Sequence, residues 1–553
     1  MNIAQRIEID PRIKSYLAKP RSLLIDGKWV GAASGKTFPV YDPSTGGVLA
    51  QVAEADAADV DKAVKAARKA FDDGPWPRMA PSERGRLIWK LAELIEKHAE
   101  ELATLESLDN GKPLTVARVA DVPLTADIFR YMAGWATKLT GTTIPISFPG
   151  EYLSYTLREP VGVVGQIIPW NFPLLMAGWK LAPALATGCT VVLKVAEQTP
   201  LSGLRLGELI AEAGIPDGVV NVLAGYGETA GAALAAHDDV DKVAFTGSTE
   251  VGKLIVKAAA GNLKKVTLEL GGKSPVVVLD DADVDAVIPG AAGAIFFNHG
   301  QSCCAGSRLM IHKKIFDKVV AGVADEAKKI KLGPGLDPGT QMGPLVSDEQ
   351  FRRVTGFIKS GIDEGAEIVA GGKKGSDNGG YFVQPTVITN TKPEMKVVRE
   401  EIFGPVVCAS PITDADLEDI ARQANATNYG LAASVWTRDI SKANKLAKRI
   451  RAGTVWINCH NVFDASLPFG GYKESGWGRE MGKFVLNNYT EVKAVTTADH
   501  QCGPCAPRQL CESAGQEGAR QPGLSGRRPA QHRDRLFHHH GRRENPGRYI
   551  ENR

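Results

Sequence analysis

The feature that most constrains the fold is an alternation, from Val161 onward, of short apolar segments with longer helical stretches. The apolar segments are residues 163–168, 190–193, 219–223, 243–245 and 266–268. Strands that are apolar throughout need cover on both faces, so the pattern predicts a parallel sheet flanked by helices, with ligands bound beyond the carboxyl ends of its strands. A second alternating series after Gly272 predicts a second α/β domain.

Other segments complete this outline. Apolar positions recur at helical spacing over residues 56–71 and 87–105, so two amphipathic helices are expected to open the protein. The second helix is expected to end near Asn110-Gly111, with a connecting region reaching about Gly150. Residues 152–157 and 489–496 alternate with period two and are expected to be edge strands that pair across subunits.

Length and composition exclude several classes of protein. A chain of 553 residues exceeds what one core usually supports, which predicts two or more domains. A formal net charge of +3 gives no reason to expect a nucleic-acid partner. The sequence has no apolar run of signal-peptide or membrane-span length, so we expect a cytoplasmic protein that does not enter a membrane. Eight cysteines in so long a chain favour reduced thiols.

The last 55 residues, 499–553, depart from the rest of the chain. They contain about ten arginines and no lysine, many Gly and Pro, and no apolar periodicity, which predicts a disordered extension. Cys502, Cys505 and Cys511 with the histidines at 538–540 lack zinc-finger spacing, so no metal site is predicted. An out-of-frame or artificial extension is the simpler interpretation, because arginine replaces lysine abruptly.

Polar side chains follow two of the predicted strands. Strand 163–168 leads into Pro169-Trp170-Asn171-Phe172-Pro173, and the next strand ends at Lys194, with Glu197 close behind. Both sets would lie at the carboxyl edge of the sheet, where ligands bind. Read alone, the first segment is equally typical of a turn with core aromatics, and the second of ordinary surface charges.

A third strand end has the character of a phosphate site. In residues 245–252, Phe-Thr-Gly-Ser-Thr-Glu-Val-Gly, a strand ends in glycine and opens a helix, which presents free backbone N–H groups and a hydroxyl to an anion. The string Gly225-x-Gly227-x-x-Ala230 matches a dinucleotide fingerprint, but the expected acid follows only at Glu250, so this match is weak.

Two side chains are candidates for chemistry. Glu269 stands between apolar neighbours before Gly271-Gly272, an environment that raises a carboxyl pKa and suits a general base; the alternative is a structural pair with Lys273. Cys303, followed by Cys304, lies among glycines and small polar residues that leave a sulfur accessible. A protease-like pairing with His299 or His312 is conceivable, and so is an inert buried thiol.

Together these segments resemble the aldehyde dehydrogenase superfamily, in its NAD-dependent, non-acylating branch. The resemblance covers roughly residues 22–498. Its motifs are Ile168-Pro-Trp-Asn-Phe-Pro, Lys194-Val-Ala-Glu-Gln-Thr-Pro, Phe245-Thr-Gly-Ser-Thr-Glu-Val-Gly, Leu268-Glu-Leu-Gly-Gly-Lys-Ser, Gly300-Gln-Ser-Cys-Cys-Ala, Glu400-Glu-Ile-Phe-Gly-Pro and Pro468-Phe-Gly-Gly.

The resemblance implies a fold and a domain organisation. It implies an α/β fold with two Rossmann-type parallel-sheet domains and a small β oligomerisation element. Residues 1–141 and 160–271 would form the NAD-binding domain and 272–472 the catalytic domain. The oligomerisation strands would be 142–159 and 486–498, which implies a homodimer or homotetramer; the extension at 499–553 departs from the family's pattern.

The resemblance also implies catalytic roles. Cys303 would attack the aldehyde carbon and carry a thioester, with the Asn171 amide and the Cys303 backbone N–H stabilising the oxyanion. Glu269 would activate the water that hydrolyses the thioester, which argues against transfer to coenzyme A. Lys180 also belongs to the implied catalytic residues, and no metal is implied.

The remaining implied residues bind the two small molecules. The implied cofactor is NAD rather than NADP, since the Glu197 carboxylate would repel a 2′-phosphate. Its implied binding residues are Ile168, Trp170, Lys194, Glu197, Gly227, Phe245, Gly247, Ser248, Gly252, Leu270, Glu401 and Phe403. The implied substrate residues are Phe172, Met176, Trp179 and Phe463, a mostly apolar and aromatic lining that favours a bulky or aromatic aldehyde. The segment 458–465 resembles phenylacetaldehyde-type members more than betaine-aldehyde members.

Three alternatives stay open at this point. They are an enzyme that transfers the acyl group to coenzyme A, an enzyme that prefers NADP, and a family member without activity that binds NAD or serves a structural purpose. Glu269 and Glu197 argue against the first two. The joint presence of Cys303, Asn171, Glu269 and Lys194 argues against the third.

Overall fold

The computed structural model describes residues 9–376, 379–412 and 416–498. Of the described residues, those within 9–145 and 154–496 belong to one compact unit, and 146–153 belong to another together with 497 and 498. The predicted extension at 499–553 lies outside the described residues. Among the described helices, none is long and apolar enough to cross a membrane.

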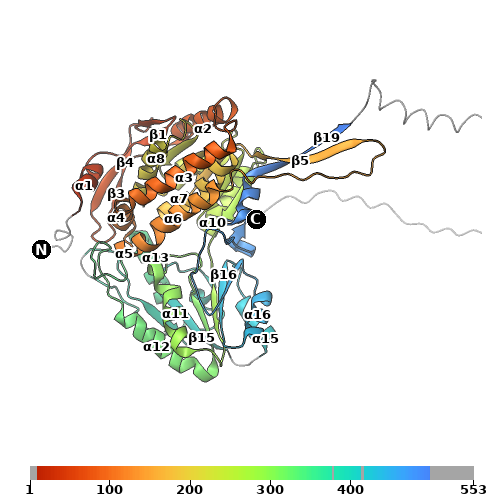
Figure 1. The fold of residues 1–553 in the computed structure, drawn as a ribbon. Coiled ribbons are helices and arrows are strands. Elements are labelled where there is room, and N and C mark those ends of the chain that lie inside the picture. Colours follow the sequence, from red (N-terminus) through yellow and green to blue (C-terminus); the bar gives the residue numbers. More distant parts are fainter. Residues whose placement is uncertain (1–8, 377–378, 413–415, 499–553) are drawn as a thin grey trace, which may run out of the picture. The chain divides into compact units, whose positions relative to one another are not determined.

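The first predicted sheet is present, and antiparallel strands extend it at both edges (Figure 1). Its strand order is β18-β10-β9-β6-β7-β8-β1-β2, and β6 to β10 run parallel. The parallel strands are β6 (Val163–Ile167), β7 (Thr190–Val195), β8 (Val220–Ala224), β9 (Lys242–Thr246) and β10 (Lys265–Glu269). The antiparallel strands are β1 (Leu23–Ile25), β2 (Lys28–Val30) and β18 (Gly476–Trp477).

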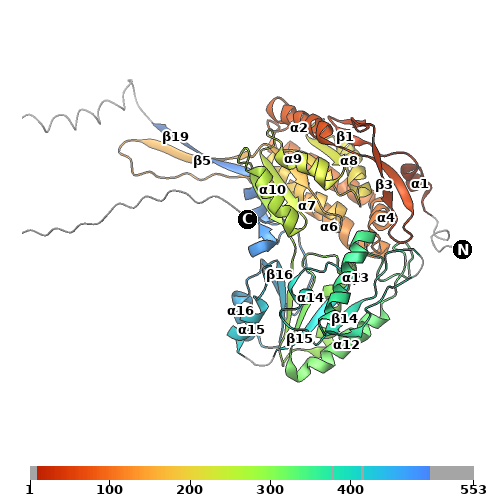
Figure 2. The same ribbon diagram turned by 180° about the vertical axis from the view of Figure 1, so that it is seen from behind.

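Helices cover both faces of this sheet, as the unbroken apolar strands predict. One face carries α3 (Pro81–Lys97), α6 (Val122–Ala133), α7 (Pro173–Thr187) and α8 (Leu201–Ala213), seen in Figure 1. The opposite face, seen in Figure 2, carries α2 (Ala57–Asp72), α9 (Ala232–Ala236) and α10 (Thr249–Ala259). The helices change face where the chain order reverses, between β6 and β9. In parallel sheets this switch point is where ligands bind.

The second sheet belongs to the series after Gly272 and has the order β13-β14-β15-β12-β11-β16-β17. Only the β13–β14 pair in it is antiparallel. Its strands are β11 (Pro275–Val278), β12 (Arg308–His312), β13 (Glu367–Ala370), β14 (Thr386–Thr389), β15 (Val406–Ile412), β16 (Ala432–Trp436) and β17 (Thr454–Ile457). Its helices are α11 (Val284–Phe296), α12 (Phe316–Lys329), α13 (Asp348–Asp363), α14 (Lys396–Arg399), α15 (Leu417–Ala424) and α16 (Ile440–Arg449).

The N-terminal third differs from the prediction. Helix α1 (Pro11–Leu17) and strands β1, β2, β3 (Thr37–Tyr41) and β4 (Val48–Ala53) precede the first predicted helix. The single helix predicted over 87–105 is two helices, α3 and α4 (Ala99–Asn110), because the backbone leaves helical geometry at His98 (φ −103°, ψ 22°). Its predicted end is confirmed by Gly111, which has φ 87°. The expected connection to Gly150 instead contains α5 (Leu114–Val116), the π-helix η2 (Ala117–Asp121) and α6.

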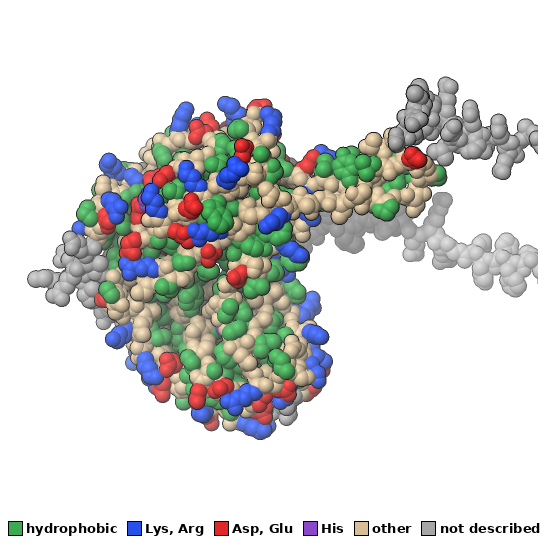
Figure 3. Space-filling model, in the orientation of Figure 1, with side chains coloured by type: hydrophobic (Ala, Val, Ile, Leu, Met, Phe, Trp, Pro, Cys, Tyr) green, Lys and Arg blue, Asp and Glu red, His purple; other side chains and the backbone are tan. Residues whose placement is uncertain are grey.

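The two segments with period-two alternation pair with each other within the chain. They are β5 (Tyr152–Pro160) and β19 (Thr490–Ala498), which form a two-stranded sheet. Lys493 and Glu159 form an ion pair across it at 2.7 Å. Hydrophobic side chains stand exposed on this sheet (Figure 3). Leu157 and Val492 are among the exposed residues of its strands. Their pairing across subunits stays a prediction.

Candidate active site

The carboxyl ends of β6, β9 and β10 open onto one cavity of about 840 Å³. Residues 169–172 after β6 and 246–250 after β9 line it from the first sheet, and residues 302–304, between α11 and β12, line it from the second. This volume lies within the range of about 300–1,000 Å³ that is usual for ligand pockets. The two sheets therefore supply one shared site, at the edge that the strand order predicts.

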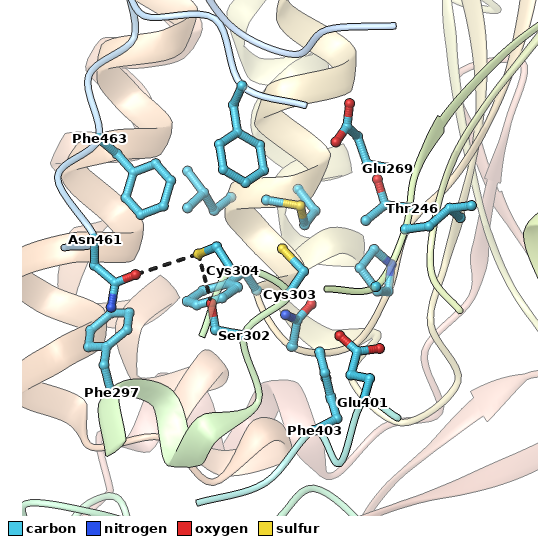
Figure 4. Close-up of a pocket in the computed structure, with 18 of the residues that line it drawn as sticks. Thr246, Glu269, Phe297, Ser302, Cys303, Cys304, Glu401, Phe403, Asn461 and Phe463 are labelled. Atoms are coloured by element: carbon cyan, nitrogen blue, oxygen red, sulfur yellow. Dashed lines mark hydrogen bonds between the residues drawn. The ribbon is translucent and has the colours of Figure 1, made fainter. Parts of the chain in front are cut away.

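The two adjacent cysteines differ in their surroundings (Figure 4). The buried Cys304 Sγ lies 3.3 Å from Ser302 Oγ and 3.5 Å from Asn461 Oδ1. The Cys303 thiol is partly exposed and points into the cavity, between Cys304 and Glu269. Its hydrogen bond with Cys304, its burial and the nearby Glu401 and Glu269 carboxyls raise the pKa of Cys303. Cys303 is thus the accessible sulfur of the pair.

Asn171 lines the cavity close to this thiol and is firmly oriented. Its Nδ2 donates to the Gln301 carbonyl at 2.9 Å, and Asn298 Nδ2 donates to the same carbonyl at 3.1 Å. An amide nitrogen carries two hydrogens, so one is left to point at a reacting oxygen. Asn298, held with φ 49°, also donates to the Asn171 carbonyl at 3.1 Å, a contact that sequence reasoning missed.

Glu269 ends β10 and is 6% exposed. Its Oε2 has no hydrogen-bond partner among the described residues. Burial and the negative charge of Glu480 raise its pKa well above the ordinary range. The alternative pairing with Lys273 does not form, because Lys273 Nζ donates to the Val397 carbonyl at 2.7 Å. A buried carboxyl with a raised pKa is suited to accept a proton near neutral pH.

Lys180 belongs to α7 and does not line the cavity. It forms a buried ion pair with Glu480, with Nζ and Oε1 2.5 Å apart. Glu480 is only 3% exposed, and sequence reasoning missed it because it lies 300 residues further along the chain. The two charges act on Glu269 in opposite directions: Glu480 raises the pKa of Glu269 and Lys180 lowers it.

The cavity also contains a helix N-terminus. Ser248 is the N-cap of α10, and its Oγ accepts the Val251 N–H at 3.2 Å. A Cβ on Gly247 would stand 2.4 Å from the Phe245 ring, and one on Gly252 would stand 2.7 Å from Leu270. These glycines let the backbone approach closely, and the helix end favours an anion. The arrangement fits the pyrophosphate of a dinucleotide.

Glu401 and Phe403 face this helix end from the second sheet. Glu401 Oε1 accepts the Gly272 N–H at 2.9 Å, and burial raises its pKa to about 7. Phe403 has the left-handed φ of 61° and contacts Trp170 edge to face at 5.2 Å between ring centroids. A Cβ on Gly271 would stand 2.2 Å from Glu401 Oε2, so glycine leaves the carboxylate its space. Left-handed backbone at a residue such as Phe403 is strained, and strain of this kind is concentrated at functional sites.

Other predicted cofactor residues lie beside the cavity without lining it. Lys194 and Glu197 follow β7, which neighbours β6, and their Nζ and Oε2 are 2.8 Å apart. Gly227 opens the exposed π-helix η3 (Gly227–Gly231), one residue beyond Tyr226. The predicted cofactor residues outside the lining are Ile168, Lys194, Glu197, Gly227, Phe245 and Gly252. Gly227 has no described contact with the site.

The four predicted substrate residues all line the cavity and form part of an aromatic group. Trp179 lies 6.3 Å from Phe463 and 5.4 Å from Phe469, between ring centroids. Phe172 stacks on Phe297 at 6.2 Å. Sequence reasoning missed Phe297 and Phe469, whose apolar neighbours resemble any core segment.

Neither histidine considered as a partner for Cys303 contacts it in the described hydrogen bonds. His299 Nε2 accepts the Gly343 N–H at 3.0 Å, and His312 Nδ1 accepts the Lys314 N–H at 3.3 Å. A third histidine, His460, is 3.0 Å from the Cys304 carbonyl through Nε2, and burial lowers its pKa to about 4. The described geometry gives no cysteine–histidine pair of the protease kind.

Comparison with known proteins identifies the family of this chain. The model of the aldehyde dehydrogenase family matches residues 29–495. The chain is 56% identical over 489 residues to a protein of Bacillus subtilis named putative aldehyde dehydrogenase DhaS, covering 88% of this chain and 98% of that one. It is 52% identical over 477 residues to a mitochondrial benzaldehyde dehydrogenase of Antirrhinum majus, covering 86% and 88%.

A solved structure gives the same answer. It is described as the NAD+ complex of an aldehyde dehydrogenase from Bacillus cereus, with a TM-score of 0.88 and 53% identity, covering 89% of this chain and all of that one. The chain belongs to the aldehyde dehydrogenase family. The predicted family, fold class and enzyme class are confirmed, and the predicted cofactor, NAD, is the one named in that complex.

Proposed function

We propose that this family member oxidises an apolar, aromatic aldehyde to the carboxylic acid with NAD, through a thioester on Cys303. The observation that carries the proposal is the convergence of the Cys303 thiol, the Asn171 amide and the Glu269 carboxyl on one cavity. Nucleophile, oxyanion donor and base are the three groups that this reaction needs within reach of one carbon.

The first half of the reaction uses Cys303 and Asn171. The thiolate adds to the carbonyl carbon, and the oxygen gains negative charge, which the free Asn171 hydrogen and the Cys303 backbone N–H stabilise. NAD, when bound, accepts the hydride that leaves the carbon of this thiohemiacetal, and the thioester remains on Cys303. The Gln301 carbonyl holds the Asn171 amide in place before the reaction begins, so no reorganisation is needed.

The second half uses Glu269. The carboxylate accepts a proton from water as the water attacks the thioester carbon, the carbon–sulfur bond breaks, and the acid leaves. The buried Lys180–Glu480 pair acts on this base through its charges, because Lys180 lowers the pKa of Glu269 and so opposes the effect of Glu480. With Glu269 in this position we propose hydrolysis rather than transfer to coenzyme A.

The surroundings of the helix end support NAD as the cofactor. We place the pyrophosphate at Ser248 and the α10 N-terminus, the adenine ribose at Lys194 and Glu197, and the nicotinamide ribose at Glu401. The Glu197 carboxylate accepts hydrogen bonds from a ribose hydroxyl but repels a 2′-phosphate, which favours NAD over NADP.

The aromatic lining supports the substrate class. Phe172, Trp179 and Phe463 offer apolar faces to the substrate. An aromatic aldehyde of the benzaldehyde or phenylacetaldehyde type gains both burial and ring contacts there. The name of the Antirrhinum majus relative agrees with this class. We also propose that the β5–β19 sheet, with exposed Leu157 and Val492, joins subunits into a homodimer or homotetramer.

The test is NADH formation by the purified protein with NAD and a panel of aromatic, aliphatic and cationic aldehydes. Cys303→Ala and its matched control, Cys304→Ala, are measured beside the wild type. We expect turnover that is fastest with aromatic aldehydes, abolished by Cys303→Ala and largely retained by Cys304→Ala. A wild type that binds NAD but oxidises no aldehyde would contradict the proposal and leave a binding role.

A further inference from the structure

Four ionisable side chains are fully buried next to the aromatic passage, and the mechanism above uses none of them. Glu106, Asp109 and Lys112 are 0% exposed and Asp121 is 1% exposed. Three of them come from the end of α4 and the turn after it, and Asp121 ends the π-helix η2. Buried charges are costly to keep, so a cluster of this size requires a reason.

Lys112 occupies the centre of this cluster. Its Nζ lies 3.1 Å from Asp121 Oδ1 and 3.4 Å from Glu106 Oε2. The same Nζ stands 4.6 Å from the centroid of the Phe172 ring. Gly111, with φ 87°, turns the chain at the end of α4; a Cβ there would meet two proline rings at 2.8 Å.

The carboxylates of the cluster hold the helices around the passage. Glu106 Oε1 accepts the Leu174 N–H at 2.9 Å, at the start of α7, and it also accepts the Ser202 hydroxyl. Asp109 Oδ2 accepts the Leu201 N–H at 3.0 Å, at the start of α8. Charged acceptors at helix N-termini are strong contacts, so the cluster fixes the helix whose N-cap is Phe172.

Phe172 contacts both the buried cluster, through Lys112, and the cavity. The ring lines the cavity and stacks on Phe297, and the residue follows Asn171 directly. The negative face of an aromatic ring attracts an ammonium group, most strongly where water is excluded. Because Lys112 is itself confined by two carboxylates, its attraction restricts where the ring can stand.

We propose that Lys112 is a positioning residue that fixes the Phe172 ring and thereby sets the enzyme's preference for aromatic over small aldehydes. The inference rests on the proposed function, since it names what tunes the aldehyde passage of that site. Lys112 touches neither substrate nor cofactor and acts only through Phe172. The buried cation therefore fixes the geometry of the passage from behind its wall.

The expected size of the effect follows from the ordering of one side chain. A ring freed from Lys112 has to be ordered by the aldehyde, at a cost of about 0.5–1.5 kcal/mol, which converts to a change of about two- to twelvefold. Lys112→Met should raise KM for benzaldehyde by that factor and change kcat less than about twofold. Acetaldehyde, too small to need the ring, should be oxidised almost as before.

The experiment measures the ratio of kcat/KM for benzaldehyde to that for acetaldehyde, in wild type, Lys112→Met and Lys264→Met. Lys264 is the control, since it is also buried and donates to two backbone carbonyls, of Ala235 and His237, away from the cavity. Each variant is repeated in a Phe172→Leu background. Asp121→Asn, which loosens Lys112 but keeps the cation, serves if Lys112→Met does not fold.

The expected result is a fall of about two- to twelvefold in the ratio for Lys112→Met, a smaller fall for Asp121→Asn and none for Lys264→Met. Neither Lys112→Met nor Asp121→Asn should change the ratio further in the Phe172→Leu background. An unchanged ratio in a folded variant, or an equal fall without the Phe172 ring, overturns the inference. The wild type separates the two failures, because a wild type without turnover refutes the proposed function itself.

Discussion

Replacing Asn171 by alanine should remove most of the rate of the first chemical step while leaving the fold nearly intact. Asn171 Nδ2 has one hydrogen bound to the Gln301 carbonyl at 2.9 Å, and the other faces the cavity. Loss of one oxyanion donor costs about 2.7–4 kcal/mol, or about a hundred- to a thousandfold in rate. The Gln301 carbonyl keeps its bond from Asn298 at 3.1 Å, so no buried acceptor is orphaned.

The assay is the rate of the NADH burst in the first turnover, together with thermal unfolding. We compare Asn171→Ala with Asn221→Ala, a buried asparagine in β8 that donates to the carbonyls of Val191 and Gly218. Asn221→Ala should lose about 1–3 kcal/mol of stability and keep its burst rate. Asn171→Ala should nearly keep its stability and lose its burst rate. A burst rate for Asn171→Ala within about threefold of wild type would refute the assignment of this donor.

Three further predictions concern charge. Burial and the Glu480 charge raise the pKa of Glu269, so the folded protein retains a proton that the unfolded chain releases near its ordinary value of 4.5. The contribution of Glu269 to the free energy of unfolding therefore falls as pH rises above that value. Glu269→Gln should be more stable than wild type at pH 8 by about 1.4 kcal/mol or more in denaturant titrations. Equal stability at pH 8 would argue against a buried, ionising Glu269. Glu197→Gln keeps the side-chain shape without the charge and should improve kcat/KM with NADP about tenfold or more, whereas an unchanged NAD to NADP ratio would remove Glu197 from cofactor selection. Glu480→Gln breaks the buried pair with Lys180 and should cost about 3–5 kcal/mol of stability. It should also move the pH profile of steady-state turnover to lower pH, because Glu269 loses its negative neighbour. A profile that stays in place would show that Glu480 does not act on this base.

Sequence reasoning predicted the parts of the fold that have a strong local signal. Strands β6 to β10 are short runs of mostly apolar residues bounded by glycine or polar residues, so their positions could be read directly. Short strands such as β1 (Leu23–Ile25) have three residues and no period to detect. Helix α6 was missed because Pro123 and Gly134 at its ends resemble the punctuation of a loop.

The site divides in the same way. Cys303, Asn171 and Glu269 stand in motifs that could be recognised, and the structure brings them to one cavity. Glu480, Asn298 and Lys112 could not be found from the sequence, because their roles depend on partners far along the chain or on a turn of the backbone. A buried lysine in particular looks like any surface lysine until its neighbours are known.

The proposed thioester on Cys303, which Glu269 would help to hydrolyse, can be detected by the mass of the trapped enzyme. Glu269→Gln is mixed with NAD and an aromatic aldehyde, quenched in acid and digested for peptide mapping. The account predicts one equivalent of NADH per active site and an added acyl group on Cys303, absent from the Cys303→Ala, Glu269→Gln double variant. An unmodified Cys303, or an acyl group on Cys304, would contradict it.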